Sequence, residues 1–135
     1  MALVADVSAV LGGALAEDDM RYALAVLRAI GADEAHVPTL FWFELRNALL
    51  MAERRKRVTG AQLATFLGEF AILPVSVDSA PSESTVLDLA RRHDLTVYDA
   101  AYLELAQRKQ LPLATLGSAL RKAARKARVS VFKSK

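Results

Sequence analysis

Short apolar runs alternate along the chain with longer segments in which apolar residues recur at helical spacing. Residues 3–5 form an uninterrupted run of the length of a short buried strand, whereas Ala, Leu and Ile between positions 23 and 30 follow the spacing of an amphipathic helix. Thr59 and Ser82 are placed to cap helices, and Gly31 is placed to end one. The predicted strands are residues 3–5, 35–37, 73–77, 113–115 and 129–132. The predicted helices are residues 8–16, 18–30, 38–57, 60–71, 82–93, 97–109 and 118–126.

This alternation predicts an α/β fold in which helices cover both faces of a parallel sheet. A chain of 135 residues has the size of one domain, so we expect residues 1–135 to form a single unit with one core. In parallel sheets of this kind, ligands bind at the carboxyl ends of the strands. The residues that directly follow each predicted strand are therefore the first candidates for chemistry.

The composition of the sequence excludes several classes of protein. The sequence contains no cysteine, which excludes a disulfide scaffold, an iron–sulfur cluster, a cysteine zinc site and a thiol nucleophile. No apolar stretch approaches the roughly 20 residues of a membrane span, and the acid at position 6 comes too early for a secretory signal. We expect a soluble, cytoplasmic protein with no membrane partner.

The net charge of +3 conceals a strong asymmetry along the chain. Residues 105–135 contain nine of the 18 Lys and Arg residues and none of the 15 Asp and Glu residues. Such a segment indicates a polyanionic partner such as nucleic acid, although a solvated basic helix has the same composition. The candidate phosphate-binding residues, which end one predicted helix and crowd the last one, are Arg54, Arg55, Arg121, Lys122 and Arg125.

Three acids spread through the chain fall at the same edge of the predicted sheet. Asp6 follows the first strand, Glu44 lies early in the helix after the second strand, and Asp99 begins a later helix. Each acid taken singly could be a helix-capping or first-turn residue. Converging carboxylates, however, repel one another and are costly to bury unless a cation holds them. Oxygen ligands without cysteine select a hard ion, so the cluster predicts a site for Mg²⁺ or Mn²⁺.

Four segments that carry these residues resemble the motifs of PIN-domain ribonucleases, and specifically the VapC-like toxin of VapBC-type toxin–antitoxin pairs. The D-x-S, E-x-x-N and Y-D-A-x-Y-x-x-L-A patterns occur in the order and at the spacing of that family. The set together is specific, and the resemblance extends over essentially the whole chain. The segments are residues 3–11, 37–49, 95–106 and 111–116.

The resemblance implies a three-layer α/β/α sandwich with a five-stranded parallel sheet and a Mg²⁺-dependent site that cuts RNA. It assigns metal binding and catalysis to Asp6, Glu44 and Asp99. Metal-site carboxylates need neighbouring polar groups that orient them or a bound water. The side chains that the resemblance places in this supporting role are Ser8, Asn47 and Thr115.

The resemblance also implies partners. Toxins of such pairs bind a cognate antitoxin and an RNA substrate, and they form homodimers or hetero-oligomers. The antitoxin helix would lie in an apolar groove near the acids, for which Phe41, Trp42 and Leu45 are candidate wall residues. We expect at least two of these three side chains to pack in the core. An antitoxin Arg or Lys entering the acid cluster would neutralise it.

The chain departs from the family pattern at one position. A fourth acid usually follows the Leu-Ala-Thr-Leu segment, and Gly117 stands there instead. Three carboxylates suffice for one divalent ion, whereas a second ion or a water positioned by the fourth acid loses its ligand. The sequence therefore predicts a Mg²⁺-dependent endoribonuclease toxin of reduced activity. A natural variant that needs only three acids is the alternative interpretation.

Two other functions are compatible with parts of the pattern. A degenerate acid site would leave a catalytically weak or inactive module that binds RNA or an antitoxin without turnover. A phosphoryl-transfer domain with Asp6 as nucleophile is disfavoured, because Ser8 stands where such domains have a second acid and the required lysine is not evident. Metal-dependent cleavage by the purified protein separates the nuclease from the binding module.

Overall fold

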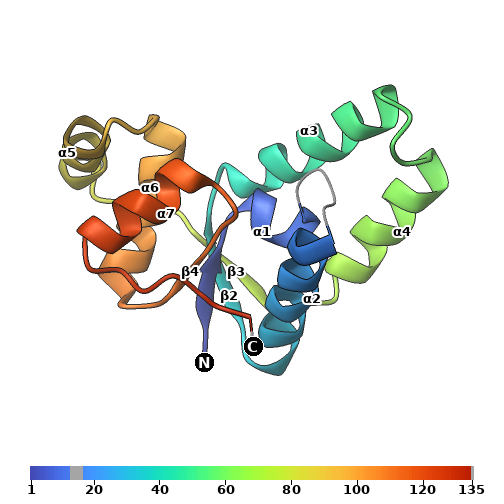
Figure 1. Cartoon of the computed structure of the whole chain (residues 1–135), viewed down its shortest axis with the longest axis horizontal. Helices are drawn as coiled ribbons and strands as arrows, with labels where there is room; N and C mark the ends of the chain where they lie inside the picture. Colours follow the sequence, from blue (N-terminus) through green and yellow to red (C-terminus); the bar gives the residue numbers. More distant parts are fainter. Residues whose placement is uncertain (13–16, 135) are drawn as a thin grey trace.

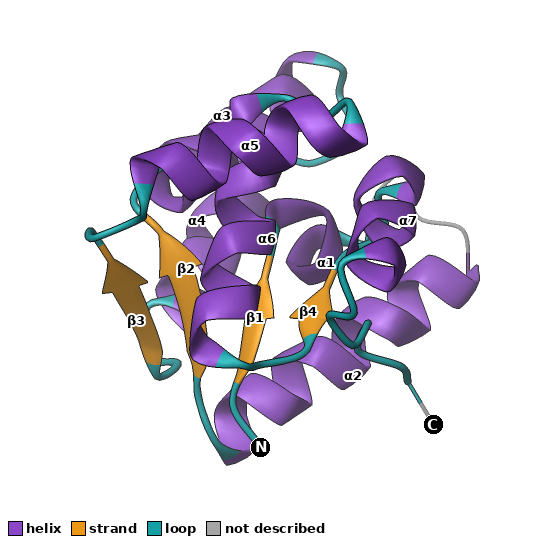
Figure 2. Ribbon diagram, turned by 90° about the vertical axis from the view of Figure 1, so that its left-hand side faces the viewer, coloured by secondary structure: helices purple, strands orange, loops and turns teal. Residues whose placement is uncertain are grey.

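Four short parallel strands form the sheet at the centre of the protein (Figure 2). The computed structural model describes residues 1–12 and 17–134. The strands are β1 (Leu3–Ala5), β2 (Ala35–Pro38), β3 (Val75–Asp78) and β4 (Leu113–Ala114), and their order in the sheet is β3-β2-β1-β4. Val4 in β1 pairs with His36 on one side and Leu113 on the other. Because the strands are parallel, their carboxyl ends lie at one edge of the sheet.

Helices cover both faces of this sheet, as the alternating pattern predicted (Figure 1). The helices are α1 (Val7–Leu11), α2 (Glu17–Ala32), α3 (Phe41–Arg54), α4 (Gly60–Phe70), α5 (Glu83–His93), α6 (Val97–Lys109) and α7 (Ser118–Lys126). The first four lie on one side of the sheet and the last three on the other. The predicted extension of the first helix to Ala16 lies outside the described residues. Of the helices that the structure describes, none has the length and apolar character needed to cross a membrane.

The predicted fifth strand at residues 129–132 is reduced to an isolated bridge between Leu113 and Val131. β4 is too short to extend this pairing into a ladder. Pro112, before β4, has no N–H to donate, and the N–H of Thr115, after it, donates to a tyrosine hydroxyl rather than to a neighbouring strand. The expectation of five strands is therefore wrong, and the described sheet has four.

β1 and α6 form the centre of the core. Every residue of β1 is buried, and α6 buries Ala100 and residues 102–106, so the helix is covered around most of its circumference. By contrast, α4 buries none of its residues. Since Asp6 directly follows β1 and Asp99 lies in the first turn of α6, these two buried elements position two of the three predicted acids.

Side-chain caps set several helix boundaries. Thr59 caps α4 in a reciprocal capping box, and Thr96 caps α6 by accepting the N–H of Asp99. Ser82 stands at the N-cap of α5 as predicted, but its hydroxyl donates to the Thr85 hydroxyl and makes no capping bond.

Two predicted helix ends are displaced. α2 continues through Gly31 to Ala32 instead of ending at the glycine. α3 ends at Arg54 rather than Arg57, because Lys56 adopts a left-handed φ of 59°, which a right-handed helix cannot include.

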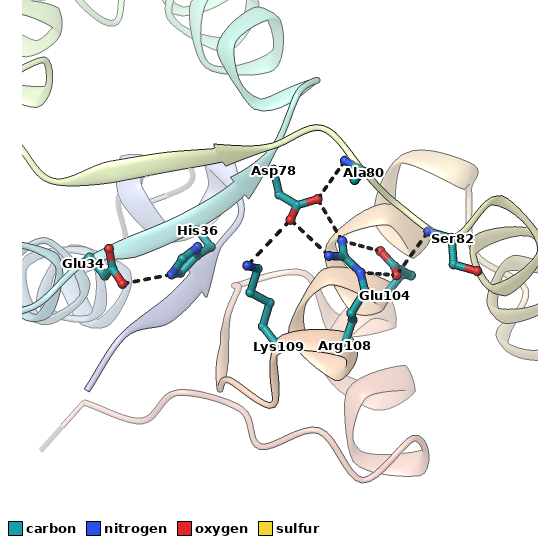
Figure 3. A network of polar contacts seen from close by, with 8 residues as sticks. All are labelled: Glu34, His36, Asp78, Ala80, Ser82, Glu104, Arg108 and Lys109. Atoms are coloured by element: carbon teal, nitrogen blue, oxygen red, sulfur yellow. Dashed lines mark hydrogen bonds and ion pairs between the residues drawn. The ribbon is translucent and has the colours of Figure 1, made fainter.

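An ion-pair network joins β3, α5 and α6 (Figure 3). Arg108 of α6 donates to both oxygens of Asp78, at the end of β3, and to both oxygens of Glu104, one turn earlier in α6. Glu104 is only 2% exposed and also accepts the N–H of Ser82 at the start of α5. Charged groups at this depth are tolerated only when they are paired and hydrogen-bonded, and these are.

Candidate active site

The Asp6 carboxylate lies in a cradle of hydroxyl groups. Asp6 is the N-cap of α1, and its Oδ1 accepts the N–H of Ala9 at 3.1 Å and the hydroxyl of Ser8 at 2.6 Å. Its Oδ2 accepts the hydroxyl of Thr115 at 2.5 Å. Burial raises the pKa of Asp6, while the hydrogen bonds from Ser8 and Thr115 lower it. These donors fix the orientation of the carboxylate and favour its ionised form.

The cradle is connected to the turn between β4 and α7. The Thr115 hydroxyl accepts the N–H of Gly117 at 3.0 Å, and the Ser8 hydroxyl accepts the N–H of Leu116 at 3.0 Å. The Thr115 carbonyl accepts Nε of Arg121 at 2.6 Å. Both hydroxyls predicted to support the acids therefore bridge one carboxylate and the backbone of this turn.

Glu44 is oriented by a tyrosine that the sequence pattern did not indicate as part of the site. Glu44 is half-buried in the first turn of α3, and its Oε1 accepts the hydroxyl of Tyr102, a buried residue of α6, at 2.6 Å. Burial raises the pKa of Glu44, the Tyr102 hydrogen bond lowers it, and the charges of Asp6 and Asp99 raise it. One feature of the sequence could have indicated that Tyr102 belongs to the site: it follows Asp99 by one turn and therefore lies on the same face of the helix.

The third acid, Asp99, is half-buried in the first turn of α6. Burial is the main cause that raises its pKa, and the charge of Asp6 raises it further. Among the described residues, no side chain or backbone group donates a hydrogen bond to the Asp99 carboxylate. The fold thus brings three predicted acids, from the start of α1 and the first turns of α3 and α6, into electrostatic reach of one another.

The chemistry of these donors fits a hard divalent cation. Carboxylate and hydroxyl oxygens are the ligands that Mg²⁺ prefers, and a cation would relieve the repulsion that raises the pKa of Glu44 and Asp99. Within residues 1–12 and 17–134, no three Asp, Glu or His side chains form a group ready to hold one ion. Protein donors from the described part of the chain occupy both oxygens of Asp6 but only Oε1 of Glu44, so the second oxygen of Glu44 is open to a cation.

Two other predicted site positions have different surroundings. Asn47 is exposed on α3 and forms no side-chain hydrogen bond with another described residue, so no contact supports its expected role. Gly117 is the N-cap of α7, with φ −70° and ψ 120°, a conformation open to any residue. A Cβ at this position would lie 3.4 Å from the Thr115 hydroxyl and 3.8 Å from Cβ of Leu120, so the structure has room for a side chain.

The predicted phosphate-binding cations fall into two groups. Arg121 is engaged in the fold, because its Nε donates to the Thr115 carbonyl and its guanidinium lies 5.0 Å from the centre of the Tyr22 ring. The exposed cations are Arg54 and Arg55 at the end of α3 and Lys122 and Arg125 on α7. These four have side chains positioned to meet a ligand from solution.

All three predicted groove-wall residues line a groove of about 260 Å³, and two of them also pack in the core, as expected. Phe41 and Leu45 are buried, whereas Trp42 is 53% exposed. A larger groove of about 630 Å³ lies between α1, α3 and α4, and its lining is mainly apolar. Ser8, which contacts Asp6, is part of that lining, so this groove lies beside the acids.

Comparison with known proteins identifies the family of this chain. The sequence matches the PIN domain family over residues 3–126, a range that includes the three acids and Gly117. The chain belongs to the PIN domain family. No curated protein matches the chain.

Solved structures resemble this PIN domain over most of its length. PAE2754 from Pyrobaculum aerophilum is 27% identical, with a TM-score of 0.68 over 91% of this chain and 87% of that chain. FitAcB from Neisseria gonorrhoeae is 16% identical, with a TM-score of 0.64 over 98% of this chain and 97% of that chain. FitAB bound to an IR36 DNA fragment is also 16% identical, with a TM-score of 0.58 over 98% and 94% of the two chains. At 16% identity, the last two establish a shared fold alone.

Tyr102→Phe should destabilise the PIN domain mainly above the pKa of Glu44. The change removes the donor to Glu44, and a hydrogen bond to an ionised, half-buried carboxylate contributes about 1–2 kcal/mol. As pH falls and Glu44 becomes protonated, this difference from the wild type should shrink. Denaturant unfolding of both proteins at about pH 4 and about pH 7 measures it. Tyr98→Phe, in the same helix but 63% exposed, is the control and should change nothing; a loss equal at both pH values would contradict the role of Tyr102.

Proposed function

We propose that this PIN domain is a Mg²⁺-dependent endoribonuclease of the VapC-like toxin class, with reduced activity. The observation that carries the proposal is the approach of Asp6, Glu44 and Asp99, in which the charge of Asp6 raises the pKa of both other acids. PIN domains are generally nucleases that use divalent metals such as Mg²⁺. The resemblance of the sequence motifs to VapC-like toxins supports RNA as the substrate.

The three acids are the residues that would hold Mg²⁺. A bound Mg²⁺ would supply an activated water for attack on a phosphodiester and would offset charge on the phosphate oxygens. The contribution of the other residues is orientation. The hydroxyls of Ser8 and Thr115 hold Asp6, and the hydroxyl of Tyr102 holds Glu44. Asp6 and Glu44 therefore begin from defined positions, which lowers the entropy cost of assembling the site.

Gly117 supports a second candidate function. The turn that carries Gly117 is bonded to the Asp6 cradle, so an acid at this position would stand beside the other carboxylates. Without it, the domain retains its RNA-binding and partner-binding surfaces but lacks one group that could position a water. A weak or inactive module that binds RNA or an antitoxin is the alternative to the nuclease.

The partner that we propose is a cognate antitoxin, seated in the groove of about 630 Å³ between α1, α3 and α4. The apolar lining suits the apolar face of an amphipathic helix, and Arg55 and Arg57 in the lining suit acids on that helix. Because Ser8 is also in the lining, a helix bound here would cover the approach to Asp6. The resemblance to VapBC-type pairs supports this partner.

Cleavage by the purified protein tests the proposed nuclease. The wild type should cut single-stranded RNA slowly with Mg²⁺ and not at all with EDTA. Asp6→Asn keeps the shape of the side chain and one acceptor oxygen but removes the ligand charge, so cleavage should fall by about 10²-fold or to background. The variant should stay folded, since burial disfavours the Asp6 charge, and its melting temperature checks this. RNA binding without cleavage in Mg²⁺ or Mn²⁺ would favour the binding module, and equal cleavage by both proteins would contradict the site.

A further inference from the structure

A basic concavity of about 380 Å³ lies between the end of α5 and α7, separate from the groove on the other side of the sheet. Its lining residues are Arg92, His93, Asp94, Ala119, Lys122, Ala123 and Lys126. Lys122 and Lys126 are exposed and form no ion pair with another described residue, while Arg92 is paired with Asp88 at 2.8 Å. Among the described residues, Asp94 is the single acid in this lining, so the concavity carries a net positive charge.

Both walls of the concavity lead directly into the candidate active site. The chain that leaves α5 at Asp94 enters α6 within a few residues and reaches Asp99 in its first turn. Gly117, the N-cap of α7, donates its N–H to the hydroxyl of Thr115, the residue that holds Asp6. α5, α6 and α7 lie on the same side of the sheet (Figure 1). A ligand that extends from the acids can therefore reach the concavity without crossing the sheet.

The two free lysines are spaced along this path. Lys122 and Lys126 are four residues apart in α7, so they share a face of the helix and are separated by about 6 Å along its axis. This is comparable with the distance between neighbouring phosphates of a single strand. Positively charged grooves that follow the backbone are the usual way to hold single-stranded nucleic acid. α7 itself contains no Asp or Glu that would compete for these lysines.

We propose that this concavity binds backbone phosphates of the RNA on one side of the bond that the acids cleave. The inference rests on the proposed nuclease function, and it adds a binding site for two successive phosphates with Lys122 and Lys126 as their ligands. Phosphate contacts hold a strand in place without reading its sequence. The concavity therefore contributes affinity and register, and it leaves the choice of bases to other parts of the protein.

Salt-dependent RNA binding tests the concavity independently of cleavage. The Asp6→Asn protein, which should not cut, is titrated with a labelled single-stranded RNA at several salt concentrations, with and without the added changes Lys122→Ala and Lys126→Ala. Loss of two phosphate contacts should reduce the slope of log affinity against log salt by about 1.4 and raise the dissociation constant roughly 10- to 25-fold at about 0.1 M salt. Arg28→Ala with Lys133→Ala, two exposed cations outside the concavity, is the control with the same change in charge.

The outcomes separate the concavity from the nuclease. If the lysine variants lose affinity and salt dependence while the control keeps both, the concavity is supported, even if the wild type never cleaves RNA. In a wild-type background that cleaves, the same lysine changes should raise KM about tenfold and leave kcat unchanged. Equal losses in the two double variants would show a general effect of net charge and overturn the proposal, as would an unchanged slope and KM in the lysine variants.

Discussion

Gly117→Asp should raise Mg²⁺-dependent RNA cleavage by about 10²–10³-fold, the usual effect of one group that stabilises developing charge. The backbone at Gly117 accepts any residue, and its Cβ would lie 3.4 Å from the Thr115 hydroxyl that bonds Asp6. The new carboxylate would therefore stand beside the cluster as a fourth oxygen donor. As the N-cap of α7, it can also accept a first-turn N–H, which adds only a few tenths of a kcal/mol over glycine.

The same substitution should couple stability to Mg²⁺. Four close carboxylates repel one another, so the melting temperature of the variant in EDTA should fall slightly, and Mg²⁺ should raise it more than in the wild type. Gly117→Asn is the matched control, because it has the same size and capping ability without the charge. Cleavage rates and melting temperatures of the three proteins are measured side by side. An equal gain with Asn, or a wild type as fast as Gly117→Asp, would mean that three acids suffice.

Arg108→Met should lower the free energy of unfolding by about 2–4 kcal/mol. Removing one partner of a buried ion pair costs roughly 3–5 kcal/mol, because the other charge is left uncompensated. Glu104, which is 2% exposed, would keep only the long hydrogen bond from the Ser82 N–H. Asp78 would lose its bidentate hydrogen bonds with the guanidinium. The expected loss is below the full value because one third of the Arg108 side chain is exposed, which lets water solvate part of the site.

The Arg108 effect should depend on pH in a defined direction. The Arg108 guanidinium holds the pKa of Asp78 below its ordinary value of 3.8. This stabilisation is present above the pKa of the unfolded state and is lost as pH falls through the lower folded value. Urea unfolding at neutral and acid pH should therefore show a smaller difference between wild type and variant in acid.

Two comparison variants make the stability prediction specific. Arg92→Met breaks a pair of the same i, i+4 spacing with Asp88, but both side chains are mostly exposed, so it should cost less than about 0.5 kcal/mol. Arg108→Met combined with Glu104→Met removes both partners and should recover part of the loss, since a buried pair can be replaced by apolar groups at little cost. A loss of the same size in Arg92→Met would contradict the importance of burial.

Sequence by itself determined the α/β class and the positions of the three acids. The period of apolar residues is a local property, so the short runs became β1, β2, β3 and β4 and the longer segments became the helices between them. Because a parallel sheet collects its carboxyl ends at one edge, the positions of Asp6 and Glu44 after two of those runs, together with Asp99 at the start of a later helix, predicted that the three acids approach one another. Asp6 and Asp99 also stand at helix starts, where local capping chemistry limits the alternatives.

Only the tertiary structure decided which side chains orient the acids and which charged side chains form contacts within the fold instead of facing solvent. The Tyr102 hydroxyl bonds Glu44, which lies 58 residues away in the sequence. Arg121 bonds the Thr115 carbonyl, whereas the next residue, Lys122, is an exposed cation. Residues 129–132 do not form a fifth strand because β4, the strand they would pair with, has only two residues. The apolar pattern of the sequence does not determine that length. Such contacts depend on the register in which α6 and α7 pack on the sheet. Periodicity specifies which face of a helix is buried, but the partner of each side chain follows from packing between distant segments.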